Sequence, residues 1–380
     1  MSQTKKPASF GNVLIVAEYA APKSGNFIAS LLDLADQIKN EGNQTTFLFP
    51  AVSQDRAWVT WILENGYQVL FYDCQQSADE KLNAIRKIVQ TYSIKLVHLH
   101  FGGLEPLFLS HCKELDVKLV IHDHFDFVTH RSQLRQRLST LRNALLYRRC
   151  GAFCVSVMKK KDAWYRLLGK QHHAFVPNGL SLRRAEQDPL TREERRQEIG
   201  LKADEKLVLF LGWDMYRKGL DIAIKATEIY RNKDHSLKIG VIGAGIDGKP
   251  EKKTIQFLQQ AGIDPFSDAV IYMHSYEDIF ALQRAVDCYI SSSRAEAFSY
   301  GILEAISQNT PVVVSDIVGT NWCWQYDNCF RYPVEDPAVC AEALQKALVR
   351  GRAPSNSADF IREYSNDVWT KRIVSIYRQL

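Results

Sequence analysis

The sequence predicts an α/β protein built from two consecutive domains, each with a parallel β-sheet. Short apolar runs alternate with helical stretches along most of the chain, which is typical of sheets joined by crossover helices. The alternation breaks near Asn178 and Gly179, where residues 181–200 are polar and charged, and then resumes. A length of 380 residues is natural for two domains of ordinary size.

The first half of the chain holds six expected strands separated by helices such as 27–39 and 80–91. Several strands are near-continuous runs of Val, Ile, Leu and Phe, as expected where both faces of a parallel sheet are covered. Right-handed crossovers between them give a Rossmann-like sheet. The expected strands are residues 12–18, 45–49, 68–72, 95–100, 118–122 and 152–157.

The second half repeats this architecture without repeating the sequence. An amphipathic pattern over residues 365–380 predicts a last helix. The expected strands of this half are residues 206–210, 238–243, 269–272, 288–292 and 312–315.

Composition narrows the class of protein. Hydrophobic residues make up 46% of the chain and charged residues 24%, as in ordinary globular proteins. Eight cysteines lack metal-site spacing, which favours reduced thiols and a cytoplasmic location. The apolar run 13–17 is short and ends at Glu18, so we interpret it as a strand and not as a signal peptide.

Residues 131–170 are strongly basic, with eleven Lys and Arg side chains and one acid, Asp162. Four leucines in this region fall on one helical face. We expect these leucines in the core and the arginines toward anionic lipid headgroups. The expected location is therefore cytoplasmic, with peripheral attachment to the inner face of a membrane. Nucleic acid fits less well, because interleaved aromatic residues are absent. The leucines are Leu134, Leu138, Leu141 and Leu145.

The segment around Glu296 and Glu304 carries the strongest functional signal. The expected strand 288–292 precedes Glu296, and a helical pattern from Gly301 to Gln308 carries Glu304. Ligands of open α/β sheets bind at the carboxyl ends of strands, and a helix N-terminus attracts phosphate. A carboxylate beside such a site suits ribose hydroxyls. These parts predict a pocket for a nucleoside diphosphate.

The segment resembles the E-x7-E motif of retaining glycosyltransferases of the GT-B fold, in the family-four group. Further landmarks of that family occur in the family's order and span nearly the whole chain. They are the glycine loop 24–28, the Pro-Asn-Gly turn 176–180, the strand and loop 210–221 with Lys218-Gly219, the strand end 241–245, and Pro311-Val-Val.

The resemblance implies the GT-B fold: two Rossmann-like domains with parallel sheets facing across a cleft. Residues 1–178 would form the acceptor domain, 179–199 an interdomain linker and 200–358 the nucleotide-sugar donor domain. Residues 359–380 would then form a helix that crosses back to the first domain.

The implied activity is transfer of a sugar from a nucleotide-diphosphate donor, a UDP-sugar for preference, to a hydroxyl acceptor. The expected acceptor is a glycan or a lipid-linked glycan, in the assembly of cell-surface polysaccharide or glycolipid. In the family, the acceptor attacks from the front face while the departing phosphate oxygen helps to deprotonate it. No cofactor is expected. No metal is expected either, which agrees with the absence of an Asp-x-Asp triplet.

The family motif assigns roles to individual residues. Catalytic roles near the transferred sugar and the diphosphate fall to Glu296, Lys218, Arg217 and His122. Donor binding falls to Glu304, which would hold the ribose, and to Phe298, Ser299, Tyr300, Gly301, Ile302, Gly25, Gly212 and His274. The chain departs from the pattern at Trp213, where the family usually has an arginine.

Other interpretations remain open at this point. Trp213 motivates a non-catalytic relative that binds glycan or protein and stabilises an active transferase. The i, i+2 spacing of His98 with His100, and of His122 with His124, permits a metal cluster, although hydrogen-bonded strand-end histidines give the same pattern. Val241-Ile-Gly-Ala-Gly245 is half of a dinucleotide fingerprint and makes a redox cofactor a weak option. A nucleotide-sugar epimerase or a phosphorylase fits the fold but not the E-x7-E spacing.

Overall fold

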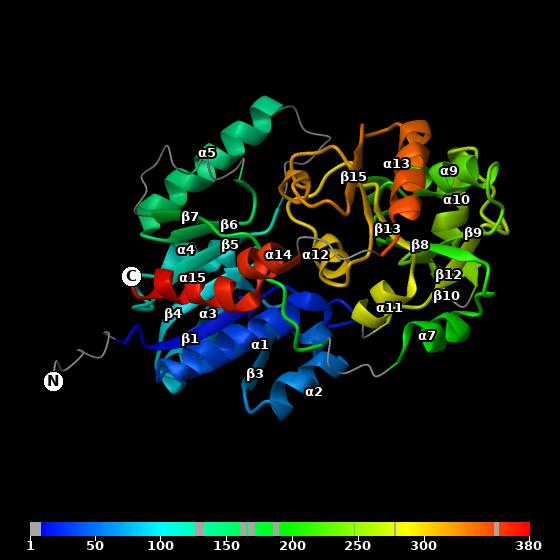
Figure 1. The fold of residues 1–380 in the computed structure, drawn as a ribbon. Helices are drawn as coiled ribbons and strands as arrows, with labels where there is room; N and C mark the ends of the chain where they lie inside the picture. Colours follow the sequence, from blue (N-terminus) through cyan, green and yellow to red (C-terminus); the bar gives the residue numbers. More distant parts are fainter. Residues whose placement is uncertain are drawn as a thin grey trace. The chain divides into compact units, whose positions relative to one another are not determined.

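The computed structural model divides the chain into two compact units (Figure 1). The first unit comprises residues 1–181 and 365–380, and the second comprises residues 182–364. The expected linker 179–199 is therefore shared between them, and residues 359–364 fall in the second unit. The structure describes residues 9–125, 133–159, 165, 172–184, 190–246, 248–276, 279–352 and 357–380.

The first unit is built on a seven-stranded parallel sheet of order β3-β2-β1-β4-β5-β6-β7. All six strands expected from its sequence are present, and the short β7 joins the edge. The strands are β1 (Asn12–Ala17), β2 (Thr45–Pro50), β3 (Gln68–Tyr72), β4 (Ile94–His100), β5 (Lys118–Asp123), β6 (Phe153–Ser156) and β7 (His173–Phe175).

Helices cover this sheet. On one face, Leu82 and Ile85 of α3, Phe108 of α4 and Tyr147 of α5 join a buried apolar cluster with the strands. The helices α1 and α15 pack on each other (Figure 1). The helices are α1 (Gly25–Asn40), α2 (Ala57–Glu64), α3 (Ala78–Thr91), α4 (Glu105–His111), α5 (Gln133–Cys150) and α15 (Asn366–Tyr377), with the 3-10 turn η1 (Ala51–Ser53).

The second unit has a six-stranded parallel sheet of order β12-β9-β8-β13-β14-β15, and a small antiparallel pair, β10–β11, lies beside it. Its five expected strands are present, and β15 was not anticipated. The strands are β8 (Lys206–Leu211), β9 (Leu237–Ile242), β10 (Gly245–Ile246), β11 (Lys249–Pro250), β12 (Val270–Met273), β13 (Cys288–Ser291), β14 (Val312–Ser315) and β15 (Cys329–Tyr332).

Helices α9 and α13 pack on this sheet around a buried core that includes Leu220, Ile224 and Leu344. Asp336 caps α13 by accepting from the backbone of Ala338 and Val339. The helices are α7 (Arg192–Ile199), α8 (Met215–Lys218), α9 (Leu220–Arg231), α10 (Lys252–Gln260), α11 (Ile279–Ala285), α12 (Tyr300–Ser307), α13 (Pro337–Arg350) and α14 (Ser357–Tyr364), with the 3-10 turn η4 (Asn321–Cys323).

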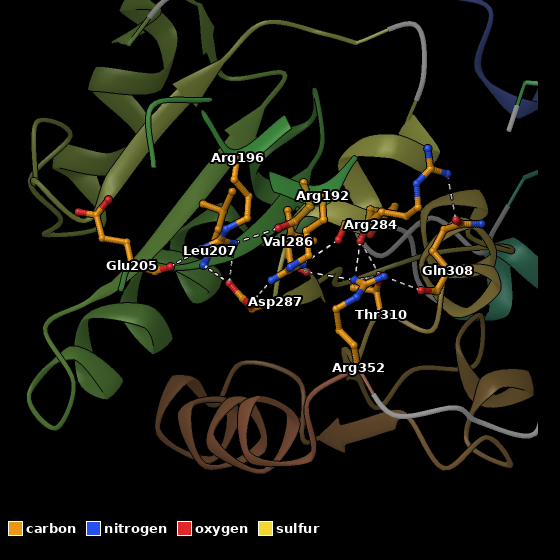
Figure 2. A network of polar contacts seen from close by, with 12 residues as sticks. Arg192, Arg196, Glu205, Leu207, Arg284, Val286, Asp287, Gln308, Thr310 and Arg352 are labelled. Atoms are coloured by element: carbon orange, nitrogen blue, oxygen red, sulfur yellow. Dashed lines mark hydrogen bonds and ion pairs between the residues drawn. The ribbon is translucent and has the colours of Figure 1, made fainter. Parts of the chain in front are cut away.

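The polar segment before β8 is anchored to the second unit through Asp287 (Figure 2). The Asp287 carboxylate accepts from Arg192 of α7 at 2.6 Å, from Arg196 at 3.2 Å and from the backbone N–H of Leu207 at 2.8 Å. A Thr191–Glu194 capping box begins α7, and Gly200 ends it in the left-handed conformation. The arginines that look like a solvated linker in the sequence therefore fix α7 in place.

Arg352 joins the same network, because the Val286 carbonyl accepts from both Arg352, at 3.1 Å, and Arg192, at 3.0 Å (Figure 2). Its guanidinium donates to the carbonyls of Gln283 at 2.9 Å and Gln308 at 2.6 Å, and to the Thr310 hydroxyl at 2.8 Å. Burial lowers the pKa of Arg352 to about 10. Among the described residues, carbonyl oxygens and one hydroxyl, and not carboxylates, thus accept the hydrogen bonds of this guanidinium.

Candidate functional site

The residues predicted to bind the nucleotide lie where the strand order of the second sheet reverses. From β8 the chain builds β9 and β12 on one side of the sheet, and β13, β14 and β15 on the other. The loops that follow β8 and β13 therefore leave neighbouring strands at the same carboxyl edge. Such a topological switch point is the usual ligand position in an open α/β sheet.

The loop after β8 is a tight turn that presents two cations. Asp214 accepts a hydrogen bond from the backbone N–H of Arg217 at 3.0 Å and caps the one-turn helix α8. Gly219 follows with a φ of 72°, and a Cβ at this position would overlap the carbonyl oxygen of Ser292. Only glycine combines this backbone angle with such a close approach.

The loop after β13 holds this turn rigidly. The backbone N–H of Arg294 donates to the Arg217 carbonyl at 2.7 Å, and the Ser292 hydroxyl donates to the Gly219 carbonyl at 2.8 Å. The Arg294 guanidinium also pairs with Asp221 at 2.8 Å. Burial opposes its charge, but hydrogen bonds to Asp221 and Glu335 raise the pKa of Arg294 above the ordinary value. Sequence reasoning missed Arg294, which stands two residues before Glu296, because its acidic partners are distant in sequence.

The two loops meet in an ion pair between expected site residues. The Lys218 ammonium lies 2.7 Å from Oε1 of Glu296, and the Arg217 guanidinium lies 3.3 Å from Oε2. The Glu296 side chain is 8% exposed, and the side chains of Lys218 and Arg217 are 20% and 41% exposed. A carboxylate this buried needs paired charge, and the two cations supply it.

Helix α12 begins beside this pair with Ser299 at its N-cap. No side-chain oxygen of Ser299 caps the helix. Instead, Tyr289 of β13 hydrogen-bonds with the Ser299 side chain. A Cβ at Gly301 would overlap the Tyr289 hydroxyl, so the first turn runs close against the strand. The helix begins without the usual side-chain cap, and Glu304 is buried one turn further along.

The remaining donor residues of the second unit occupy different positions around these loops. Phe298 stacks on Trp322 with ring centroids 4.6 Å apart, a contact that the sequence did not indicate. A Cβ at Gly212 would come within 2.7 Å of the Lys218 side chain. His274 is exposed and follows the edge strand β12, and its ring centroid lies 4.3 Å from that of Tyr276. In the sheet, β9 lies between β12 and β8, so His274 follows a strand that is not a neighbour of β8.

The first unit holds the other two expected residues. Gly25 begins α1 with a φ of 56°. His122 lies at the carboxyl end of β5, is buried, and shares a hydrogen bond of 3.2 Å with His98. Burial lowers the pKa of His122 well below its ordinary value, so this imidazole is neutral near pH 7. The more accessible histidine of this strand end is His124, which is half-buried.

The expected burial of the leucine face of α5 is wrong at two of its four leucines. Leu141 is half-buried, and the Leu134 side chain lies outside the described residues. Leu138 and Leu145 are 56% and 53% exposed, and the buried positions of the helix include Thr140, Ala144 and Tyr147. Tyr147 turns its own side of α5 toward the core, because its ring joins the apolar cluster and its hydroxyl donates to Glu105 at 2.8 Å. Several basic residues of the region, Arg131, Lys160, Lys161, Arg166 and Lys170, lie outside the described residues.

Comparison with known proteins agrees with the fold. Residues 191–351 match the family model described as Glycosyl transferases group 1, and this match supports that family. Lipopolysaccharide glucosyltransferase WaaG of Escherichia coli is 28% identical over 185 residues, which cover 48% of each chain. Alpha-monoglucosyldiacylglycerol synthase of Streptococcus pneumoniae is 21% identical over 77% of this chain and 68% of its own.

Solved structures show the same fold at low sequence identity. Anabaena HepE, in complex with UDP and glucose, superposes with a TM-score of 0.78 at 17% identity, covering 97% of this chain and all of its own. The structure of WaaG has a TM-score of 0.61 at 16% identity, covering 96% and 94% of the two chains. The chain therefore has the GT-B fold of two parallel-sheet α/β domains. The matched segment spans about half the length of the relative WaaG.

Proposed function

We propose that this protein is a retaining glycosyltransferase that moves a sugar from a nucleoside diphosphate to a hydroxyl acceptor. The observation that carries the proposal is the Lys218–Glu296 ion pair at the switch point of the second sheet, beside the N-terminus of α12. The group 1 family match covers this same region. Retention follows from the resemblance of Glu296 and Glu304 to the E-x7-E motif.

Lys218 and Arg217 would stabilise the leaving group. When the bond between the anomeric carbon and the diphosphate oxygen breaks, negative charge grows on that oxygen, and a fixed cation nearby lowers the barrier. Ser292 and Arg294 hold the backbone of these two residues, so the cations need little rearrangement. Because the cations take this role, the proposed chemistry uses no metal ion.

Glu296 would change partners when the donor binds. Without a ligand it neutralises Lys218 and Arg217. A bound diphosphate would draw the two cations away and leave a carboxylate facing the transferred sugar, where it can accept hydrogen bonds from sugar hydroxyls. Glu304 would accept the ribose hydroxyls, and the backbone N–H groups of residues 299–302 would face the diphosphate.

A membrane-associated acceptor is the proposed substrate class. Leu138, Leu145 and Leu146 project from α5 into solvent, and Arg142 and Arg148 are also exposed on this helix. Exposed leucines beside arginines suit the interface of an anionic bilayer. The names of two relatives, a lipopolysaccharide glucosyltransferase and a diacylglycerol glycoside synthase, point the same way. Among the described residues, no helix is both long and apolar enough to cross a bilayer.

A non-catalytic partner protein is the second candidate. Trp213 is 57% exposed where the family usually has an arginine, so one cation is absent from the phosphate loop. Such a protein would bind a nucleotide sugar without turnover.

A donor panel tests the proposal. Purified protein is mixed with UDP-, GDP-, ADP- and dTDP-sugars, and thermal stabilisation and release of the nucleoside diphosphate are followed, with and without membrane lipid extract as acceptor. Stabilisation and release by one donor, a UDP-sugar by expectation, supports the transferase. Stabilisation without release under every condition supports the non-catalytic partner. No response to any nucleotide overturns the pocket assignment.

A further inference from the structure

Four histidines form a stacked group inside the first unit. His98 and His100 lie two residues apart on β4, and His122 and His124 lie two residues apart at the end of β5. Parallel pairing places His100 opposite His122, and side chains two residues apart on a strand share a face. The rings of His98 and His122 stack with centroids 5.3 Å apart, and those of His122 and His124 are 4.3 Å apart.

This group lies on the sheet face that carries α1 and α15. The strand residues that alternate with these histidines include Val97, Leu99 and Ile121, and these three belong to the apolar cluster of the opposite face. Phe27 of α1 meets His100 edge-on at 5.3 Å, and Trp369 of α15 lies 6.0 Å from His122. His98, His100 and His122 are each 2% exposed or less. Three imidazoles have thus replaced the aliphatic residues that such a position usually holds.

The hydrogen bonds of the group leave two ring nitrogens unused. Nδ1 of His98 bonds to the Tyr377 hydroxyl at 2.6 Å, and Nδ1 of His100 bonds to Nε2 of His124 at 2.8 Å. Nε2 of His98 shares a hydrogen bond of 3.2 Å with Nδ1 of His122. Nε2 of His100 and Nε2 of His122 are buried and have no hydrogen-bond partner among the described residues. A buried polar atom without a partner costs free energy, so two of them in one cluster require an explanation.

The spacing of these nitrogens fits one metal ion. His98, His100 and His122 can each offer a ring nitrogen such that all three lie within 4.8 Å of one another. Zinc–nitrogen bonds of about 2.0–2.1 Å place tetrahedral ligands roughly 3.3 Å apart. The site would therefore close when Nε2 of His98 releases Nδ1 of His122 and the three rings shift by small amounts. Metal-bound histidines commonly hydrogen-bond through the other ring nitrogen, as His98 does to Tyr377 and His100 does to His124.

We infer that His98, His100 and His122 bind a divalent transition-metal ion, and that this ion is zinc. Three imidazoles without a carboxylate exclude magnesium and calcium, which require oxygen ligands. His124 is half-buried and bonds to His100, so it lies on a path from the surface to the site. The metal would join β4 and β5 directly, and through Tyr377 it would fasten α15. The inference concerns a structural site. It takes His122 out of the sugar-binding role that the family motif gave it, and it leaves the proposed roles of Lys218, Arg217 and Glu296 unchanged.

The test uses the full-length protein without an affinity tag. After chelation and buffer exchange, zinc is titrated with thermal unfolding as the readout, and cobalt is titrated with visible absorption as the readout. We expect one ion per chain, a rise in melting temperature with zinc, and the intense visible bands of tetrahedral cobalt. A folded wild-type protein that shows neither zinc stabilisation nor a cobalt spectrum overturns the inference.

Variants locate the site. His100→Gln and His122→Gln should each abolish the cobalt spectrum, and Tyr377→Phe should weaken cobalt binding about tenfold because it removes only the partner of a ligand. His235→Gln changes an exposed histidine of the second unit and should bind like wild type. Cobalt binding that survives both ligand substitutions, or that His235→Gln removes, places the ion elsewhere and refutes the assignment.

Discussion

Lys218 and Glu296 form an ion pair of 2.7 Å that joins the loop after β8 to the loop after β13. The two residues are far apart in sequence, but β8 and β13 are hydrogen-bonded neighbours in the sheet. The loop after β8 is held at its backbone, because the Ser292 hydroxyl donates to the Lys218 carbonyl and the Arg294 N–H donates to the Arg217 carbonyl. The pair is therefore part of a rigid assembly that a diphosphate would have to enter.

Lys218→Met should lower the rate of nucleoside diphosphate release from the cognate donor by about a hundred- to a thousandfold, because it removes a fixed cation from the leaving group. Arg217→Met should cost less, about tenfold, since that side chain is 41% exposed and its charge is better screened. Steady-state kinetics of donor hydrolysis measure both. Lys202→Met makes the same chemical change at an exposed site and should leave the rate unchanged. A Lys218→Met enzyme with nearly normal kinetics would remove Lys218 from the reaction.

Glu304→Gln should weaken binding of the nucleoside diphosphate roughly tenfold or more, because a hydrogen bond to a charged group contributes about 1.5–3 kcal/mol. Calorimetric titration gives the affinity. The same loss should appear when wild type binds a diphosphate that lacks the ribose 2′ and 3′ hydroxyls, and the variant should not discriminate between the two ligands. The exposed Glu193→Gln is the matched control. If the variant still prefers the intact ribose by the wild-type factor, Glu304 does not hold the ribose.

Leu145→Ser should weaken sedimentation of the protein with anionic vesicles about tenfold, since burying a leucine in the interface contributes about 1.5–3 kcal/mol. Arg142→Gln should cost less, about 1 kcal/mol, and its effect should fade as salt rises. Val349→Ser is the control, because Val349 is 80% exposed on α13 of the second unit. Equal binding of all three variants would show that α5 does not face the membrane.

The apolar pattern of the sequence was enough to locate strands that are buried along their whole length. Strands such as β1 and β8 are continuous apolar runs, so their position and type could be predicted without tertiary information. β15 was missed because Cys329-Phe-Arg-Tyr332 carries a charge in a short strand at the sheet edge. On α5, the leucine spacing suggested the buried face, but the Tyr147 ring and its bond to Glu105 decide the orientation. A leucine stripe predicts an amphipathic helix and does not say which side meets the core.

For the site residues too, local motifs indicated single residues, whereas the contacts between them depend on strand pairing. The motif indicated Glu296 and Lys218 individually, but their contact depends on β8 pairing with β13. The histidines were visible as two i, i+2 pairs, and only the register of β4 against β5 brings His100 opposite His122. Long-range register is set by the whole sheet, so local patterns could not decide between separate strand-end histidines and one cluster.

Gly219→Ala and Gly262→Ala form a matched pair that separates backbone strain from steric overlap. The two glycines have φ angles of 72° and 71°, but only at Gly219 would a Cβ meet another chain segment, the Ser292 carbonyl. A left-handed alanine costs about 1–2 kcal/mol, which is the expected loss at Gly262. Overlap should bring the loss at Gly219 to about 3 kcal/mol or more. Chemical denaturation measures the free energy of unfolding of both variants. Equal losses would mean that the loop after β8 is not held against the loop after β13.

The histidine cluster should make the metal-free protein sensitive to acid. Burial lowers the pKa of His98 to about 3 and that of His124 to about 4, and it also holds the pKa values of His100 and His122 well below the ordinary range. These imidazoles are neutral when folded, whereas the unfolded chain takes up protons below about pH 6.5. The unfolded state then binds more protons, so stability is complete above that pH and falls as the pH drops toward 4.

Each such histidine contributes a slope of about 1.4 kcal/mol per pH unit within this window. Urea unfolding in the presence of a chelator, at pH 7.5, 6.5 and 5.5, should show wild type losing stability toward acid. His98→Asn should have a lower stability at pH 7.5 but a shallower slope, by about one proton. His235→Asn, at an exposed position, should keep the wild-type slope. An unchanged slope in His98→Asn would mean that this imidazole is already protonated in the folded protein, or solvated, and would contradict the buried neutral cluster.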